Sequence, residues 1–153
     1  MYWMTAGLAT VLGAVMLLYF QNITLPQLGV DDGQFKPLAN QPNGVSTQSI
    51  DEAKRVAPIP FEGDRDEVMQ QLEALISEVP GATIKQLSGH YLYAVFSSAT
   101  FGFRDDVEIF VDEANSLIHF RSQSRAGYSD LGVNRKRYQS FAKYFNQGLP
   151  GKS

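Results

Sequence analysis

The segment 121–137 concentrates the polar side chains of this sequence that could form a binding site. Ser122 and Ser124 lie two residues apart, so they would share one face of a strand. The chain then turns at Gly127 and enters a helix, whose free N–H groups favour an anion. Arginine side chains suit a bidentate grip on a carboxylate or phosphate. One interpretation is a site for a small anionic or polar ligand, formed by Ser122, Ser124, Arg125, Asp130, Asn134 and Arg135.

The same residues also have a purely structural interpretation. Asp130 would cap the last helix, and Arg121 and Arg125 would form ion pairs with acidic residues of a neighbouring strand. Those acids are Asp105, Asp106 and Glu108. Residues 61–113 carry eleven acids against three bases, a balance of −8, and residues 121–153 carry seven bases against one acid, a balance of +6. Two such halves would neutralise each other in the fold, and both interpretations stay open.

Catalysis by these groups lacks the arrangement that it needs. A serine nucleophile requires a base within hydrogen-bond reach. His119 is the nearest base in sequence, but on a strand it points away from Ser122 and Ser124. Asp105 and Asp106 are adjacent and face opposite ways, which disfavours a carboxylate dyad. The sequence therefore predicts no catalytic residue.

Composition narrows the remaining classes. The chain has 153 residues, no cysteine and two histidines, so thiolate chemistry is excluded and a metal site has few ligands available. The formal net charge of −3 and the lack of a basic-aromatic module argue against nucleic acid. We predict neither a metal nor a cofactor.

The first twenty residues contain no charged side chain. Twenty helical residues span roughly 30 Å, the thickness of a bilayer core, so the pattern predicts an uncleaved transmembrane anchor. A cleaved signal peptide would need a basic start, which is missing. Small side chains that would permit helix packing in lipid are Ala6, Ala9, Thr10, Gly13 and Ala14. We expect an inner-membrane location with the C-terminal domain in the periplasm. The expected partners are the lipid bilayer and membrane proteins that contact the helix and the following arm.

Three regions follow from changes in composition: an anchor over residues 1–21, an extended arm over 22–60 and a globular domain over 61–153. The arm holds five of the seven prolines, which disfavours a long helix. In the domain, Asp64 would cap an amphipathic helix, and the last helix would start near Asp130 with a buried stripe. That stripe is Leu131, Tyr138, Phe141, Ala142 and Phe145.

Strand patterns lie between these two helices. They cover residues 82–87, 91–98, 106–112 and 116–124. Short turns between them favour antiparallel pairing. The predicted fold class is α+β: an antiparallel sheet of four or five strands with two helices on one face, preceded by a single N-terminal transmembrane helix.

Several motifs resemble the domain of unknown function 1499 family of bacteria and plastid-bearing organisms. The most specific is the run R-S-Q-S-R-A-G-Y-S-D-L-G-V-N-R over residues 121–135. The L-G-V segment at residues 28–30, the P-N-G-V-S-T block at 42–47 and D-D-V-E at 105–108 agree with it. One departure is Gly44, where the family usually has cysteine. The resemblance implies a domain and no established activity.

Two functions remain open at this point. The first is a membrane-anchored, periplasm-facing accessory module that acts through protein contacts, as a subunit of a membrane protein complex. The alternative is a binding or enzymatic domain for a small anionic or polar ligand at the arginine, serine and asparagine cluster before the last helix.

Overall fold

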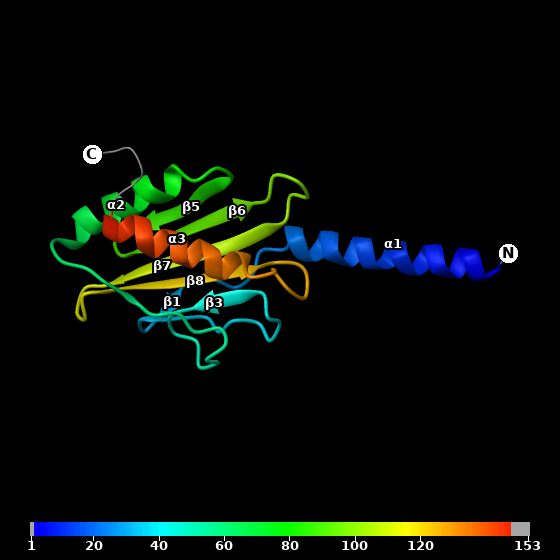
Figure 1. Ribbon diagram of the computed structural model, residues 1–153, viewed down its shortest axis with the longest axis horizontal. Helices are drawn as coiled ribbons and strands as arrows, with labels where there is room; N and C mark the ends of the chain where they lie inside the picture. The colour runs from blue at the N-terminus through cyan, green and yellow to red at the C-terminus, as the bar shows by residue number, and fades with distance from the viewer. Residues whose placement is uncertain (1, 148–153) are drawn as a thin grey trace.

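The computed structural model describes residues 2–147 of the chain, and the side chains of residues 10–147. Among these residues, four long strands form an antiparallel meander at the centre of the fold (Figure 1). They are β5 (Ala82–Ser88), β6 (Tyr91–Ser97), β7 (Arg104–Asp112) and β8 (Leu117–Ser124). They coincide closely with the predicted runs, because each is a short run with strand-forming or alternating residues between turns.

The arm adds strands that the sequence did not predict. β3 (Gly44–Ser46) and β4 (Ile59–Pro60) both pair with β8, which makes one sheet of six strands in the order β3-β8-β7-β6-β5 with β4 also on β8. β1 (Val30–Asp31) and β2 (Gln34–Phe35) form a separate two-stranded sheet. The predicted fold class is therefore wrong in its strand number. These strands are two or three residues long, which is too short for an alternation of apolar and polar residues to mark them.

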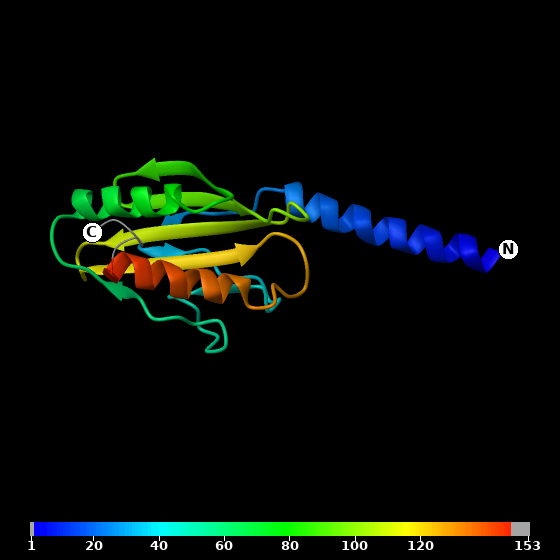
Figure 2. The same ribbon diagram turned by 45° about the horizontal axis from the view of Figure 1, so that its top comes forward.

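α2 (Arg65–Ser77) and α3 (Val133–Gln147) lie across the same face of the sheet (Figures 1 and 2). Asp64 caps α2 by accepting from the backbone N–H groups of Asp66 and Glu67. Val68, Leu72 and Ile76 of α2 are buried against Ile109 and Phe120 of the sheet. The prediction that Leu131 belongs to the buried stripe of the last helix is wrong, because Leu131 precedes α3 with a φ of 52° and is 87% exposed.

The arm covers the opposite face of the sheet. Phe35 is buried there among Tyr91, Tyr93 and Phe110, with Leu28 packed beside them. The sheet is thus sandwiched between two helices and a folded arm.

α1 (Tyr2–Ile23) projects from one end of the sheet (Figures 1 and 2). Over the residues described, no helix is long and apolar enough to cross a membrane, and this finding overturns the predicted transmembrane anchor.

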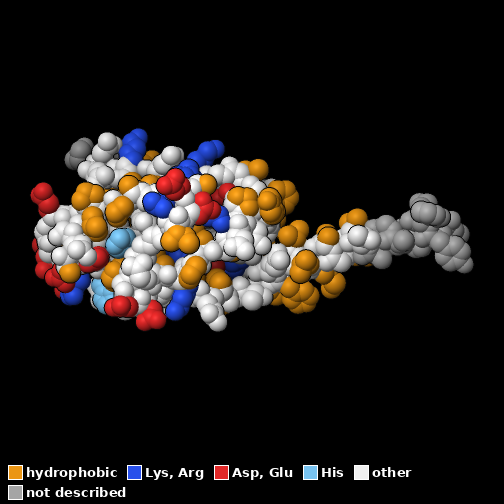
Figure 3. Space-filling model, turned by 90° about the horizontal axis from the view of Figure 1, so that it is seen from below, with side chains coloured by type: hydrophobic (Ala, Val, Ile, Leu, Met, Phe, Trp, Pro, Cys, Tyr) orange, Lys and Arg blue, Asp and Glu red, His pale blue; other side chains and the backbone are white. Residues whose placement is uncertain are grey.

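The described part of α1 has an exposed apolar surface (Figure 3). Of the predicted helix-packing residues, Thr10 and Ala14 are exposed and Gly13 has nothing within 4 Å of an added Cβ, while the side chains of Ala6 and Ala9 lie outside the described set. Asn22 connects the C-terminal end of α1 to the domain through two hydrogen bonds. Its amide donates to the carbonyl of Gly102 at 2.9 Å, and its side-chain oxygen accepts the N–H of Arg104 at 2.7 Å.

Candidate functional site

The pairing of β7 with β8 places the acids of one strand directly opposite polar residues of the other. Asp105 pairs with Ser124, Asp106 with Gln123, and Glu108 with Arg121. Because successive side chains alternate between faces, the polar residues separate into two groups. One group lies under α3 and the other under the arm.

The first group is the helix-face network, which comprises Asn43, Asp105, Ser122, Ser124, Asp130, Asn134 and Arg137. Asn134 is fully buried at its centre. Its amide donates to the Asn43 carbonyl at 2.9 Å, the Ser124 hydroxyl at 3.0 Å and an Asp130 carboxylate oxygen at 2.8 Å. Its side-chain oxygen accepts from the Ser122 hydroxyl and from an Arg137 guanidinium N–H. Every hydrogen-bonding position of this asparagine is therefore occupied.

The second group consists of the arm-face ion pairs, Glu108–Arg121 and Asp106–Arg125. Arg121 Nη1 lies 2.8 Å from Glu108 Oε2, and Arg125 grips Asp106 with two hydrogen bonds of 2.8 and 2.7 Å. All four side chains are 5% exposed or less. Glu108 also accepts the backbone N–H of Gly29 at 2.7 Å. The ion pairs thus balance the acidic and basic halves of the chain and hold the arm to the sheet.

Tyrosines reinforce the arm-face ion pairs. The Tyr91 hydroxyl donates to Glu108 at 2.8 Å, and the Tyr93 hydroxyl donates to Asp106 at 2.7 Å. Burial is the main cause that raises the pKa of both phenols, and the neighbouring carboxylates raise it further. A hydrogen bond to Asp106 raises the pKa of Arg125. At neutral pH these tyrosines are donors and the arginine is a cation, so the pairing persists.

The structure brings together four of the six residues predicted to form a ligand site. Ser122, Ser124, Asp130 and Asn134 meet in the helix-face network. Arg125 lies on the opposite face of the sheet, and Arg135 donates to the backbone carbonyl of Ala53 at 2.6 Å. Asp130 caps α3, as the structural interpretation predicts, by accepting from the N–H groups of Gly132 and Asn134. Among the described residues, no buried side-chain nitrogen or oxygen lacks a partner.

A threonine, a histidine and an aspartate are aligned where the arm meets β8. Thr47 Oγ1 lies 3.1 Å from His119 Nδ1, and His119 Nε2 lies 3.8 Å from Asp112 Oδ2. The Thr47 hydroxyl is engaged with the backbone, because it accepts the N–H of Phe120 at 3.1 Å and contacts its carbonyl at 3.4 Å. Burial lowers the pKa of His119. This arrangement links the arm to β8 and leaves the threonine oxygen poorly placed to attack a substrate.

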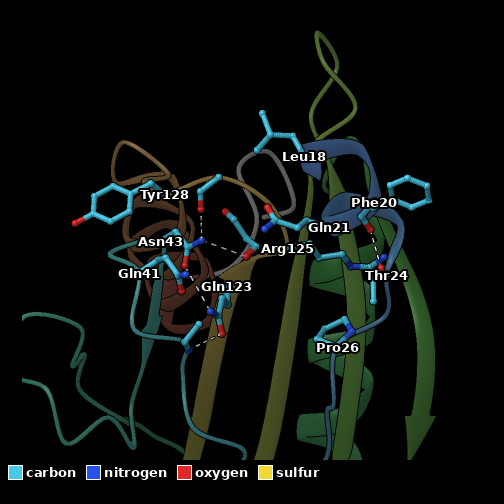
Figure 4. Close-up of a pocket in the computed structure, with 13 residues that line it drawn as sticks. Leu18, Phe20, Gln21, Thr24, Pro26, Gln41, Asn43, Gln123, Arg125 and Tyr128 are labelled. Carbon is cyan, nitrogen blue, oxygen red and sulfur yellow. Dashed lines mark hydrogen bonds between the residues drawn. The ribbon is translucent and has the colours of Figure 1, made fainter. Parts of the chain in front are cut away.

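A cavity of about 570 Å³ lies between the end of α1 and the end of β8 (Figure 4). Leu18 and Gln21 line it from α1, and Asn43 and Gln123 line it from the domain. Ser124 and Arg125, two of the predicted ligand residues, also contribute to its wall. Two of its polar side chains are already paired: Gln123 donates to Asn43 at 3.5 Å, and Arg125 forms an ion pair with Asp106. Arg125 is the charged side chain that lines this cavity, and its charge is thus already neutralised by Asp106.

Comparison with protein-family models matches residues 34–145 to DUF1499, a family described as proteins of unknown function. The chain belongs to the DUF1499 family. The match includes β2, the arm strands that pair with β8, the meander and most of α3, so the helix-face network falls inside it. A search among curated protein sequences finds no match.

The DUF1499 resemblance also directs attention to two positions that reasoning from residue chemistry missed. Asn43 holds the helix-face network together from the arm, through its backbone carbonyl and through an amide that donates to the Gly127 carbonyl at 2.8 Å. Gly44 follows on β3, where an added Cβ would lie 2.9 Å from the Ser122 carbonyl oxygen. Both belong to the P-N-G-V-S-T block, which was the only sequence signal for them.

Arg137 was not included in the predicted site, although its side chain connects α3 to the sheet. Its guanidinium donates to Ser122 at 3.0 Å and to Asp105 at 2.6 Å, and it lies 4.6 Å from the centre of the Phe96 ring. The helical period from Asn134 to Arg137 places both side chains over the sheet. The three-residue spacing between Asn134 and Arg137 was the sequence signal that could have identified Arg137.

Proposed function

We propose that this DUF1499 protein is a non-catalytic accessory module, and that α1 is the element that docks into a partner protein. The observation that carries the proposal is the exposed apolar surface of α1. Val11, Leu12, Val15, Met16 and Leu17 are each more than half exposed. Such a surface in water is unfavourable by roughly 1.5–3 kcal/mol for each large side chain, so a partner that covers it would gain considerable binding energy.

The shape of the exposed surface indicates what kind of partner would fit. Apolar side chains occur all around the described part of α1 instead of along one stripe. A helix that is apolar on all sides is suited to burial among several other helices. We therefore propose a partner protein that surrounds α1 with apolar helices.

The connection of α1 to the domain supports the same role. Asn22 bridges the turn between β6 and β7 with two backbone hydrogen bonds, so the helix has a defined direction relative to the sheet. A partner that binds α1 would also hold the domain at a fixed position. In addition, the buried polar side chains among the described residues are all hydrogen-bonded within the chain, as expected for a scaffold.

Site-specific crosslinking in the source cells tests this proposal. A photo-reactive amino acid replaces Val15, and in a matched control it replaces Ile50, which is 96% exposed on the arm. We expect the Val15 probe to trap one discrete protein that the Ile50 probe does not trap. The purified partner should then form a complex with the full chain that Val15→Asp dissociates. Adducts with lipid alone, or the same products from both positions, would refute the proposal.

A further inference from the structure

A second surface of the domain is independent of α1. α2 packs mainly on β5, whereas α3 packs on β8 and β3, so the two helices cover opposite margins of the same sheet face. They meet where Gln71 donates to the Phe145 carbonyl at 3.0 Å. Between the end of α2 and the first half of α3 they leave a groove of about 440 Å³. This volume lies within the roughly 300–1,000 Å³ that small-molecule sites occupy.

The groove has an apolar floor. Phe96 and Phe120 of the sheet line it from below, while Ile76 and Phe141 line it from the two helices. All four side chains are buried, so their positions are fixed by packing. A hydrocarbon chain laid in this groove would contact rigid aromatic and aliphatic surface.

The polar residues of the groove carry an excess of positive charge. Arg137 and Lys136 line it on α3, and Asp105 is the acid that lines it on the sheet. Asp105 is neutralised by Arg137 at 2.6 Å. Lys136 has no ion-pair partner among the described residues, and Ser140 lies one turn further along the same helix. The ammonium group of Lys136 is therefore the charge at this groove that no described acidic side chain neutralises.

We propose that the groove binds a single-chain amphiphile with an anionic head group, such as a fatty carboxylate. The chain lies on the Phe96 and Phe120 floor, and the carboxylate contacts Lys136 with the Ser140 hydroxyl beside it. An apolar groove with one uncompensated cation favours this class over a neutral lipid or a fully polar anion. The ligand would bind beside the helix-face network, because Arg137 and Asp105 of that network form part of the groove wall.

Calorimetric titration of the full chain with dodecanoate below its micelle concentration tests the proposal. We expect saturable binding of one ligand per chain, and weaker binding of dodecanol, which lacks the charge. Lys136→Gln should weaken dodecanoate by about fivefold or more, because a charge-assisted contact is lost. The matched control Lys85→Gln removes a lysine from the opposite side of the sheet and should bind as the parent does.

A blocking variant separates the groove from the exposed surface of α1, which could also attract amphiphiles. Ser140→Trp places an indole in the groove, and Ser77→Trp places one on the exposed end of α2, outside it. Ser140→Trp should abolish the saturable binding, whereas Ser77→Trp should retain it. Equal binding by both variants, or no saturable binding by the parent, would overturn the proposal. Neither result depends on whether α1 has a protein partner.

Discussion

Arg121 and Glu108 face each other across β8 and β7, and their buried side chains form an ion pair with Nη1 2.8 Å from Oε2. The carboxylate also accepts from Tyr91 and from the backbone of Gly29. This one acid therefore joins two strands and the arm. The acidic and basic halves of the sequence meet here inside the fold.

Glu108→Gln should destabilise the domain strongly. The amide preserves the shape of the acid but leaves the Arg121 charge buried without a counter-ion. Breaking one side of a buried pair costs about 3–5 kcal/mol in the free energy of unfolding. Urea denaturation measures this loss. The control Glu113→Gln removes an exposed acid that lies 3.5 Å from Arg65, and it should unfold as the parent does. A Glu108→Gln protein as stable as the control would contradict the role given to the ion pair.

Asn134→Asp should also be destabilising, although the two side chains have the same shape. The new carboxylate cannot donate to Asn43 or Ser124, and it would lie against the Asp130 carboxylate. Each buried group left unsatisfied costs about 1–3 kcal/mol. The thermal unfolding midpoint of Asn134→Asp is compared with that of Asn146→Asp, a substitution at an exposed position on the same helix. Similar unfolding midpoints would show that the helix-face network contributes little.

Gly44→Cys would restore the residue that the family resemblance places at this position. Its Cβ would lie 2.9 Å from the Ser122 carbonyl oxygen and 3.1 Å from Gln123 Cβ. β3 would have to move away from β8, and overpacking of this kind costs about 1–3 kcal/mol. Chemical denaturation under reducing conditions measures the change. An unchanged or increased stability would mean that β3 accommodates a side chain without moving.

Stability should fall between pH 7.5 and pH 5.5, partly through His119. Burial lowers the pKa of this histidine in the folded state below its ordinary value of 6.5. As the pH falls through 6.5, the unfolded chain takes up the proton first, and the folded state loses relative stability until the lower folded pKa is passed. Denaturation curves at both pH values, for the parent and for His119→Gln, measure the effect. The variant should lose less stability than the parent over this interval; an equal loss would exclude His119 as the cause.

Asn22→Ala should release α1 from the domain without unfolding the sheet. The substitution removes both hydrogen bonds to the turn between β6 and β7. Spin labels on Val15 and on Glu73 of α2 would report the distance between helix and domain. We expect a narrow distance distribution in the parent and a broad one in the variant. Gln21→Ala, one residue earlier, is the control and should keep the narrow distribution.

The strands β5 to β8 and helix α2 were predictable because their signals are local. Asp64 caps α2 within three residues, and the alternation of Val107, Ile109 and Val111 identifies β7 without reference to other segments. The arm strands were not predictable, because Gly44 to Ser46 become a strand only through pairing with β8, far along the chain. Hydrophobic periodicity carries no information about such a partner.

The candidate site was predicted in part for a similar reason. Spacing along one strand correctly separated Ser122 from Arg121, and it placed Asp105 and Asp106 on opposite faces. The same spacing put Arg125 on the face of Arg121, but it could not show that the arm covers this face or that Arg137 of α3 reaches Asp105, because those contacts depend on packing between elements. The structural interpretation of Arg121, Arg125 and Asp130 is confirmed by their partners. Binding of a small anionic or polar ligand at the predicted site stays a prediction.

The pairing of β3 with β8 has a consequence for how the chain acquires its structure. The meander from β5 to β8 closes only short turns, whereas β3 must wait for a strand that lies more than seventy residues later, from Gly44 to Gln123. Contacts between distant segments form slowly, because the entropy lost in closing the loop precedes the gain. We therefore expect the arm to assemble last and to detach first during transient opening, so that amide exchange along residues 44–46 is faster than along β7.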